Sequence, residues 1–449
     1  MGVFKIKKGR NIRLKGAAHK ELVDKTGARK AAVQPPDFRG LKPRLAVAEG
    51  DRVKVGAPLI VDKEVEGLKL LSPLCGKVTA INRGAKRALL EVVVEADGTQ
   101  EAESLSFFSP QEIEGATKES ITTALLAGGL WPAIRQRPFH KIANPKETPK
   151  SIFVRGLNTE PLAPDLDYIL KDQEKDFQTG LDILKKLTKG PVHVCAGRQA
   201  TSKALTASQG VEVHRFSGPH PAGNIGTQIH YVDPILKGDI VWFVEAQDVI
   251  RIAQLLTTGK YPTSTIVALT GEGVKNPTYA KTVVGAALSE LLGESDLTGQ
   301  RCITGGCLAG RAVGAQGFVG FYDSQVTVIP EGGKREFLGW LAPGFNKFTF
   351  SHTYASSFLG ERDVSLDTDE HGGHRAIVLN NVYDRYNALD LCTFFLLRAV
   401  IAEDYDEAER LGILECDEED FALCTFACPS KTDIGGIIRK GLDVIEKEG

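Results

Sequence analysis

The spacing of hydrophobic positions changes several times along this chain. Up to about Glu101, valine-rich runs alternate with polar turn signals, a pattern typical of short strands. From about Leu105 to Leu256, short apolar runs alternate with helical periodicity. Strand-like runs return up to about Pro330, and helical spacing dominates the C-terminal part of the chain. These changes predict an α/β protein with several domains.

The first region predicts a small β module. The stretches 47–62 (VAEGDRVKVGAPLIVD) and 72–81 (SPLCGKVTAI) look like a half-repeat of a barrel-sandwich hybrid, the fold of lipoyl and biotinyl carriers. Gly50, Gly56 and Gly76 are expected at its turns or close backbone approaches. We therefore predict an N-terminal β region with a lipoyl-like module over residues 1–104.

The second region, residues 105–257, is predicted to be a Rossmann-like α/β domain, because buried-type strands alternate with helices. The predicted strands are 152–155, 192–196, 211–216 and 240–244, and the predicted helices are 109–128, 173–187 and 246–257. Ser109-Pro110 has the character of a helix cap and first turn.

Three further segments complete the predicted architecture. Residues 258–335 predict a β-grasp (SLBB-like) module, with strands in 264–277, 302–310 and 321–333 and a helix over 282–293. Residues 336–379 predict a connecting segment of strands and loops. Residues 380–449 predict a helical C-terminal domain, degenerate ferredoxin-like, with helices at 390–404, 404–414 and 434–449.

Composition narrows the classes of function. The 449 residues are 42% hydrophobic and 25% charged, with a net charge of −2, so no overall field favours nucleic acid or anionic lipid. The longest apolar run, 391–402, is interrupted by Arg398 and is too short to cross a bilayer. The basic start of the chain is not followed by the apolar stretch of a secretory signal. Membrane association is therefore expected through another protein.

Eight scattered cysteines predict reduced thiols and no metal centre. Cys424-x3-Cys428-Pro429 resembles half of a ferredoxin motif, but two thiolates are too few for an iron–sulfur cluster. Phosphate-binding and catalytic motifs are missing as well: the chain has no G-x-G-x-x-G, Walker A, HExxH or GxSxG sequence. We therefore predict no catalytic residue.

Two loops carry candidate binding residues. In 125–141, Trp131, Arg135, Arg137 and Phe139 place cations beside aromatic rings, which suits a quinone whose ring stacks and whose carbonyl oxygens accept hydrogen bonds. A partner interface and an ordinary surface loop remain open alternatives for this segment.

The second loop is 216–234, where His220 and His230 are candidates for polar contacts in a cleft. A histidine that is buried and hydrogen-bonded is the alternative for each. They lack a third ligand at short spacing, so no metal site is expected.

Several stretches together resemble one family, the NqrA (alpha-type) subunits of the sodium-translocating NADH:quinone reductase. They are 5–9, 49–59, 72–87, 130–139, 217–230, 337–351, 417–431 and 445–449. SGPHPAG followed by GTQIH, and ALCTFACP, are the most specific. The chain departs from the family at Ala388, where a proline is usual, and in 377–390, which puts details of the partner-facing surface in doubt.

The resemblance implies a peripheral protein on the cytoplasmic face of the bacterial inner membrane, docked on the membrane protein NqrB and accompanied by the other Nqr subunits. That complex couples NADH oxidation and ubiquinone reduction to Na+ export. FMN, riboflavin, FAD and iron–sulfur centres are expected in the partner subunits and no redox cofactor in this one, although quinone interaction has been attributed to it.

Through this family the chain is also related to the RnfC protein of the Rnf complex and to the NADH-binding flavoprotein subunit of complex I. The flavin loop of those relatives corresponds to Gly128-Gly129-Leu130-Trp131, and their cysteine run to Cys424 and Cys428. Both are degraded here. The alternatives are a flavin- and NADH-binding oxidoreductase subunit, and a lipoyl-like carrier modified at Lys63.

Overall fold

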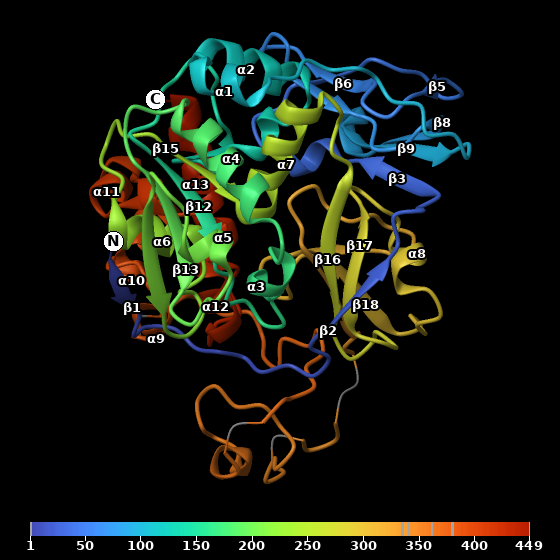
Figure 1. Ribbon diagram of the computed structural model, residues 1–449. Coiled ribbons are helices and arrows are strands. Elements are labelled where there is room, and N and C mark those ends of the chain that lie inside the picture. Colours follow the sequence, from blue (N-terminus) through green and yellow to red (C-terminus); the bar gives the residue numbers. More distant parts are fainter. Residues whose placement is uncertain (1, 334–335, 340, 361, 379–380, 449) are drawn as a thin grey trace.

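The computed structural model describes residues 2–333, 336–339, 341–360, 362–378 and 381–448. Two sheets form the body of the molecule, a seven-stranded one and a six-stranded one, with the smaller β module beside them (Figure 1). The predicted multidomain α/β organisation is confirmed at this level.

The seven-stranded sheet has the order β1-β14-β13-β12-β15-β10-β11. Its strands are β1 Val3–Lys5, β10 Arg135–Arg137, β11 Lys141–Ile142, β12 Ser151–Gly156, β13 Val192–Gly197, β14 Glu212–Ser217 and β15 Val241–Glu245. The four central strands, β14, β13, β12 and β15, are parallel, and β10 runs antiparallel to β15. The four strands predicted from buried apolar runs are thus confirmed. Because the chain steps outward from β12 to β14 and then crosses to β15, the crossovers diverge between β12 and β15.

Alternate residues of the central strands pack on opposite faces of this sheet. Val154 and Trp242 belong to the core that contains α4 and α7, whereas Phe153 and Phe243 belong to the core that contains α6. The helices of the domain are α1 Pro110–Gly115, α2 Lys118–Ala127, α3 Leu166–Ile169, α4 Glu174–Lys185, α5 Lys203–Thr206, α6 Ile225–Val232 and α7 Ala246–Thr258. The helix predicted over 109–128 is two helices, because Thr117 caps α2 and interrupts the run.

The β module consists of two small sheets, β3-β9-β8-β5 and β4-β6-β7. Its strands are β3 Lys30–Val33, β4 Pro43–Leu45, β5 Arg52–Val53, β6 Pro58–Asp62, β7 Lys69–Leu71, β8 Gly76–Arg83 and β9 Leu89–Ala96. The first 24 residues lie outside it: β1 extends the seven-stranded sheet, and β2 His19–Asp24 extends the six-stranded sheet. This differs from the single N-terminal β region that the sequence pattern predicted.

The six-stranded sheet has the order β19-β18-β20-β16-β17-β2. Its further elements are β16 Ser264–Thr270, β17 Thr278–Val283, α8 Leu288–Leu292, β18 Gln300–Thr304, β19 Arg311–Val313 and β20 Gln325–Pro330. The helix predicted over 282–293 was wrong in its first half. Residues 278–283 pair with β16 as a strand, consistent with the β-branched residues Thr282 and Val283, and Gly285 turns the chain at φ 73°.

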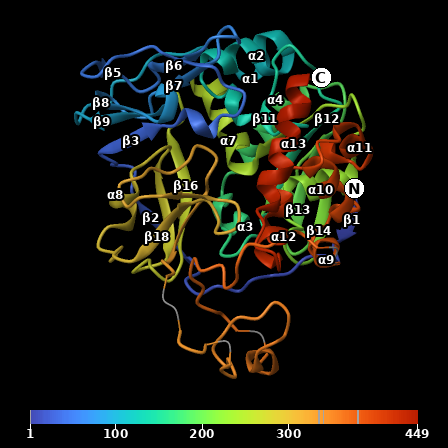
Figure 2. The ribbon, with the colours of Figure 1, turned by 180° about the vertical axis from the view of Figure 1, so that it is seen from behind.

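The C-terminal domain is helical, as predicted. It contains α9 Val382–Tyr386, α10 Thr393–Ile401, α11 Tyr405–Arg410, α12 Ala422–Ala427, α13 Ile434–Glu448 and the 3-10 helices η5 Ile413–Glu415 and η6 Glu418–Phe421. Ile12 and Leu14 from the start of the chain join its core. Seen from behind, α12 and α13 lie in front of the seven-stranded sheet (Figure 2). Cys424 and Cys428 are buried in this core, where both contact Tyr383.

The connecting segment after β20 projects from the body as an extended loop (the orange trace at the bottom of Figure 1). Its described part contains one short 3-10 helix, η4 Ala355–Phe358, and several exposed apolar side chains. An irregular, exposed segment of this length is typical of a binding loop.

A charged cavity at the meeting point of three domains

A cavity of about 330 Å³ lies beside the carboxyl ends of β12 and β15. Arg155 and Glu245 line it from these two strands. The loops 304–310 and 320–325 line it from the domain of the six-stranded sheet, and residues 417–419 line it from the helical domain. In open α/β sheets, ligands bind where crossovers diverge at the carboxyl ends of strands. The fold therefore places this cavity where a ligand is expected.

Arg135 forms a rigid cationic wall of the cavity. Its side chain on β10 donates to Glu245 Oε1 at 2.6 Å and lies 3.0 Å from His140 Nε2. The guanidinium carbon also lies 4.4 Å from the ring centre of Phe243 and 4.2 Å from that of Tyr322. Two aromatic rings and a carboxylate thus fix the orientation of this cation.

Arg137, two residues further along β10, fastens the helical domain to the sheet. Its fully buried guanidinium lies 2.8 Å from Glu419, 3.3 Å from Asp420 and 3.6 Å from Asp417. Burial opposes ionisation of Asp417, but His140 and Arg137 outweigh it and hold its pKa well below the usual range. For Asp420, burial prevails over Arg137 and raises the pKa of the carboxyl. The cluster is therefore a charge-compensated seam between domains.

The other predicted residues of the first loop lie around the cavity rather than in it. Trp131 is fully buried, donates from its indole nitrogen to Ala143 O at 2.7 Å and packs edge-on against Trp242. The half-buried Phe139 accepts a hydrogen bond at its carbonyl from Arg439 at 3.0 Å. Of the four residues predicted in this loop, Arg135 alone lines the cavity.

The two predicted histidines lie apart from the cavity. The pKa of the buried His220 is lowered to about 4, chiefly by burial, and its Nδ1 lies 3.3 Å from Thr159 Oγ1. His230 on α6 pairs through Nδ1 with Glu415 Oε2 at 2.5 Å, across the boundary with the helical domain. Both therefore make contacts within the protein.

Several residues of the cavity were not predicted from the sequence. Burial raises the pKa of Glu160 to about 7 and that of Asp37 to about 6. Glu160 lies against Gly306, where an added Cβ would come within 2.3 Å of its carboxylate, so a larger residue there would displace the Glu160 side chain. The clue was the glycine-rich stretch 305–310, and Arg155 was marked by its place at the end of a predicted buried strand.

The cavity is better suited to a neutral polar ligand than to a phosphate or a metal ion. His140, Asp417 and Glu419 place three ligand-type atoms within 4.8 Å of one another. Arg39 already contacts the carboxylate of Asp417, and Arg137 and Arg155 contact that of Glu419. Little net negative charge is left to attract a cation. Glu245 and Glu418 also line the cavity, and their negative charges disfavour a phosphate.

Comparison with known proteins identifies the family. The NqrA N-terminal barrel-sandwich hybrid domain matches residues 4–97, the NqrA second alpha/beta domain matches 116–261, and the NQRA C-terminal domain matches 266–315. The NqrA subunit of the Na(+)-translocating NADH-quinone reductase of Pasteurella multocida (strain Pm70) is 40% identical over 446 residues, 99% of each chain. The chain belongs to this family.

Relatives of the same name give the same result over the full chain. The NqrA subunit of Yersinia pestis is 40% identical over 454 residues, and that of Neisseria meningitidis serogroup B (strain ATCC BAA-335 / MC58) is 39% identical over 449, each covering 100% of both chains. Among solved structures, an NAD+-reducing [NiFe]-hydrogenase in the air-oxidised state aligns with a TM-score of 0.34 and 11% identity, over 51% of this NqrA-family chain and 52% of its own. The family resemblance inferred from the sequence is thus confirmed.

Among the described residues, the helices are all too short or too polar to span a bilayer.

Proposed function

We propose that this chain works as the peripheral NqrA subunit of a Na+-translocating NADH:quinone reductase, docked on the membrane protein NqrB at the cytoplasmic face, with the redox groups in its partners. Identity of 40% along the full length of a subunit with that name carries the proposal. The experiment is affinity purification of the tagged chain from detergent-solubilised membranes of its own cell. The other Nqr subunits should co-purify, and recovery of the chain alone would contradict the proposal.

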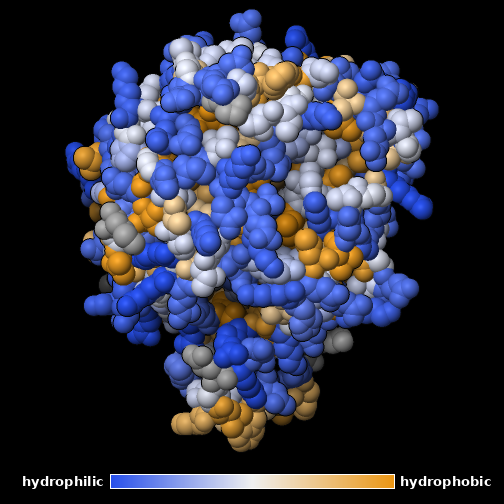
Figure 3. Space-filling view, in the orientation of Figure 1, coloured by the Kyte–Doolittle hydropathy of each residue, from blue (hydrophilic) through white to orange (hydrophobic). Residues whose placement is uncertain are grey.

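The projecting connecting segment is the surface we assign to docking. Phe337 is 94% exposed and Phe358 is 90% exposed, and Leu341, Phe345 and Leu359 lie exposed between or beside them. Figure 3 shows this apolar group at the lower tip of the molecule. Exposed apolar patches of this kind mark interaction sites, and a membrane-embedded partner presents a matching surface.

Substitution of the docking surface tests this assignment. Phe337→Ser combined with Phe358→Ser should reduce co-purification by at least about tenfold, since central aromatic residues dominate interfaces. Leu236→Ser is the matched control, because Leu236 is 68% exposed but lies on another surface. Equal recovery of the double variant and the control would remove the docking assignment and leave the family membership intact.

We also propose that the charged cavity binds the head group of a quinone such as ubiquinone. The guanidinium carbon of Arg135 lies 4.2 Å from the ring centre of Tyr322, so a ring entering the cavity meets a cationic donor beside an aromatic side chain. Arg155 offers a second donor from the neighbouring strand. Quinones need this combination, because their carbonyl oxygens accept hydrogen bonds while their rings stack. Trp131, Arg137 and Phe139 would act indirectly, by holding the loop that carries Arg135, whereas His220 and His230 are assigned no contact.

A titration with a short-chain quinone, followed by tryptophan fluorescence, tests the cavity. We expect saturable quenching that weakens about tenfold in Arg135→Gln, the loss of one cation–aromatic or hydrogen-bond contact in a desolvated site. Arg198→Gln is the control, because Arg198 lines a different cavity. Absent quenching, or equal affinities in the two variants, would contradict quinone binding here.

A flavin- or NADH-binding role is the second candidate. A cavity of about 740 Å³ lies at the carboxyl ends of β12, β13 and β14, beside Gly156, Gly197 and Gly218. Nucleotides occupy this position in doubly wound folds. Asp165 and Asp167 line it as well, and their charge disfavours a pyrophosphate. This role predicts a yellow protein with a flavin absorption band, or saturable binding of NADH.

Two finer assignments belong to the same proposal. We assign the six-stranded domain to the β-grasp (SLBB-like) class and the helical domain to a degenerate ferredoxin-like class. A carrier role for the β module would require a modified Lys63, whose side chain is exposed just after β6. An intact mass equal to that of the unmodified chain would exclude that carrier role.

A further inference from the structure

We infer a binding site for a divalent transition-metal ion of the zinc class at His193, Glu212 and His214. The three residues come from adjacent parallel strands, with His193 of β13 paired in register with Glu212 of β14. His214 follows two positions later, so its side chain emerges on the same face of the sheet as that of Glu212. The site is near the amino ends of these strands, at the opposite edge of the sheet from the charged cavity.

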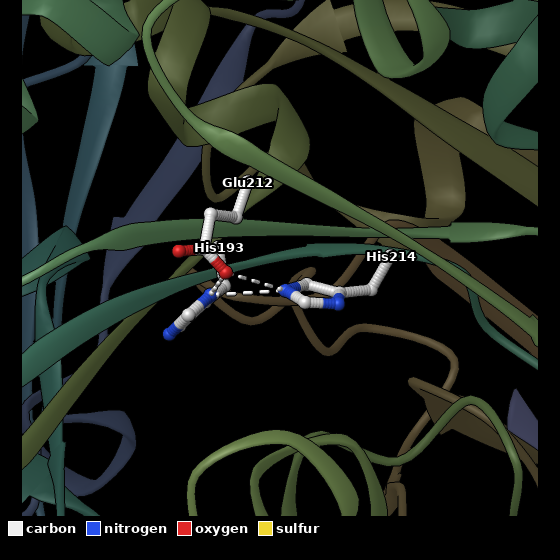
Figure 4. Close-up of side chains that lie close together, drawn as sticks. All are labelled: His193, Glu212 and His214. Atoms are coloured by element: carbon white, nitrogen blue, oxygen red, sulfur yellow. Dashed lines mark hydrogen bonds and ion pairs between the residues drawn. The ribbon is translucent and has the colours of Figure 1, made fainter. Parts of the chain in front are cut away.

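The distances among the three side chains match those around a tetrahedral ion. His193 Nδ1 lies 3.0 Å from His214 Nε2, and Glu212 Oε2 lies 3.5 Å from each of these nitrogens. Bonds of about 2.0–2.1 Å at tetrahedral angles separate ligand atoms by roughly 3.3 Å. Figure 4 shows the carboxylate facing both imidazoles, so the three atoms form one face of a tetrahedron.

Burial and exposure divide the site in a way that suits a bound ion. His193 and His214 are 4% and 5% exposed, which fixes their rings, whereas the side chain of Glu212 is 51% exposed. An ion can therefore enter from solvent beside Glu212 and keep water as its fourth ligand. Two imidazole nitrogens and one carboxylate oxygen are a ligand set that Zn2+ uses when one position stays open.

The charges around Glu212 are compatible with a bound cation. No arginine or lysine among the described residues makes an ion pair with Glu212.

Metal binding requires one defined proton shift. The amide of Gly2 donates to Nδ1 of His214 at 3.2 Å, which places the proton of His214 on Nε2, facing Nδ1 of His193. When an ion binds at Nε2 of His214, the proton on that nitrogen moves to Nδ1. Nδ1 then can no longer accept the hydrogen bond from the amide of Gly2. Loss of that bond should accelerate hydrogen exchange of the Gly2 amide.

Cobalt is the probe for the test, because tetrahedral Co2+ absorbs visible light. The chelator-treated full-length chain should develop tetrahedral bands that saturate at one equivalent and disappear when Zn2+ is added. Glu212→Gln should weaken binding by at least about tenfold, the smallest loss expected for a ligand when outer-shell partners already contribute that much. His193→Gln should lose the bands.

Two control variants separate this site from other histidines. His140→Gln alters the arginine-compensated cluster, and His374→Gln alters a histidine whose side chain is 76% exposed. Both should bind Co2+ as the unchanged chain does. Absence of bands in the unchanged chain, or bands that persist in His193→Gln, would overturn the inference, as would bands lost only in His140→Gln. Because Glu212 is half exposed, Glu212→Gln should fold normally, so its titration keeps the test decisive.

Discussion

Two clusters of histidines and carboxylates lie at the seven-stranded sheet and differ in what surrounds them. His140, Asp417 and Glu419 form one, and His193, Glu212 and His214 form the other; in each, three ligand-type atoms lie within 4.8 Å of one another. Arginines enclose the first and turn it into a seam between domains, whereas the second has no such compensation in the described part of the chain. Counter-charge, more than the identity of the ligand residues, thus separates a structural junction from a site that attracts a cation.

The largest effect should come from removing the central cation of the arginine-rich cluster. Arg137→Ala leaves buried carboxylates without their partner, and breaking a buried ion pair in this way costs about 3–5 kcal/mol. Urea unfolding measures the change in the free energy of unfolding. Arg410→Ala, at a side chain 78% exposed, should change it by less than about 0.5 kcal/mol. If Arg137→Ala lowered the free energy of unfolding no more than this control does, the seam would not hold the domains together.

The histidine cluster should respond to metal by a smaller amount. Zn2+ at 100 times its Kd should stabilise the unchanged chain by about 2.7 kcal/mol, the linkage expected for one site that exists in the folded state alone. Chelator should remove the gain, and Glu212→Gln, whose Kd for Zn2+ should be at least about tenfold higher, should retain at most about 1.4 kcal/mol of it at the same Zn2+ concentration. If Arg137→Ala or His140→Gln abolished the stabilisation by Zn2+ and Glu212→Gln did not, the metal would bind at the arginine-rich cluster and the comparison would be reversed.

The secondary structure was largely predictable from the sequence, whereas the clusters were not. Buried apolar runs located β12 to β15, and the predicted strands 192–196 and 211–216 already contained His193 and His214. The register between two parallel strands depends on the tertiary structure. The sequence therefore contained no sign that His193 and His214 lie next to Glu212. Arg137 and Glu419 are separated by 282 positions, which explains why the sequence placed Arg137 among binding residues rather than in a domain junction.

Local turns and long-range pairing explain the remaining differences. Residues 282–293 carry helix-like apolar spacing, yet Thr282 and Val283 pair with β16 as the end of strand β17. Pairing between distant segments outweighed local preference there. The amino-terminal strands likewise pair with strands more than 200 positions away, which no local pattern encodes.

A smaller, pH-dependent effect should arise at the cavity wall. Burial raises the pKa of Glu160 from 4.5 to about 7, so the folded protein binds a proton that the unfolded chain has released in this window. This contribution to stability is fully present below pH 4.5 and is lost as the pH rises to about 7. Glu160→Gln should flatten that part of the stability profile, measured by urea unfolding at several pH values. An unchanged slope would show that Glu160 stays ionised when folded.

Loss of one guanidinium at the cavity should have the smallest effect on the fold. Arg135→Lys keeps the charge but loses the contacts of the guanidinium with the rings of Phe243 and Tyr322, worth about 0.5–2 kcal/mol. Thermal unfolding should shift by only a few degrees, less than in Arg137→Ala. An equal or larger shift would mean that Arg135 belongs to the structural seam and not to a ligand site.

Restoration of activity tests the central claim most directly. Membranes from cells that lack this chain should show no Na+-stimulated quinone reduction by NADH, and adding back the purified chain should restore it. The Phe337→Ser and Phe358→Ser double variant should fail to restore it, and Leu236→Ser should succeed. Full Na+-stimulated activity in membranes without the chain would contradict its assignment as a working subunit of the complex.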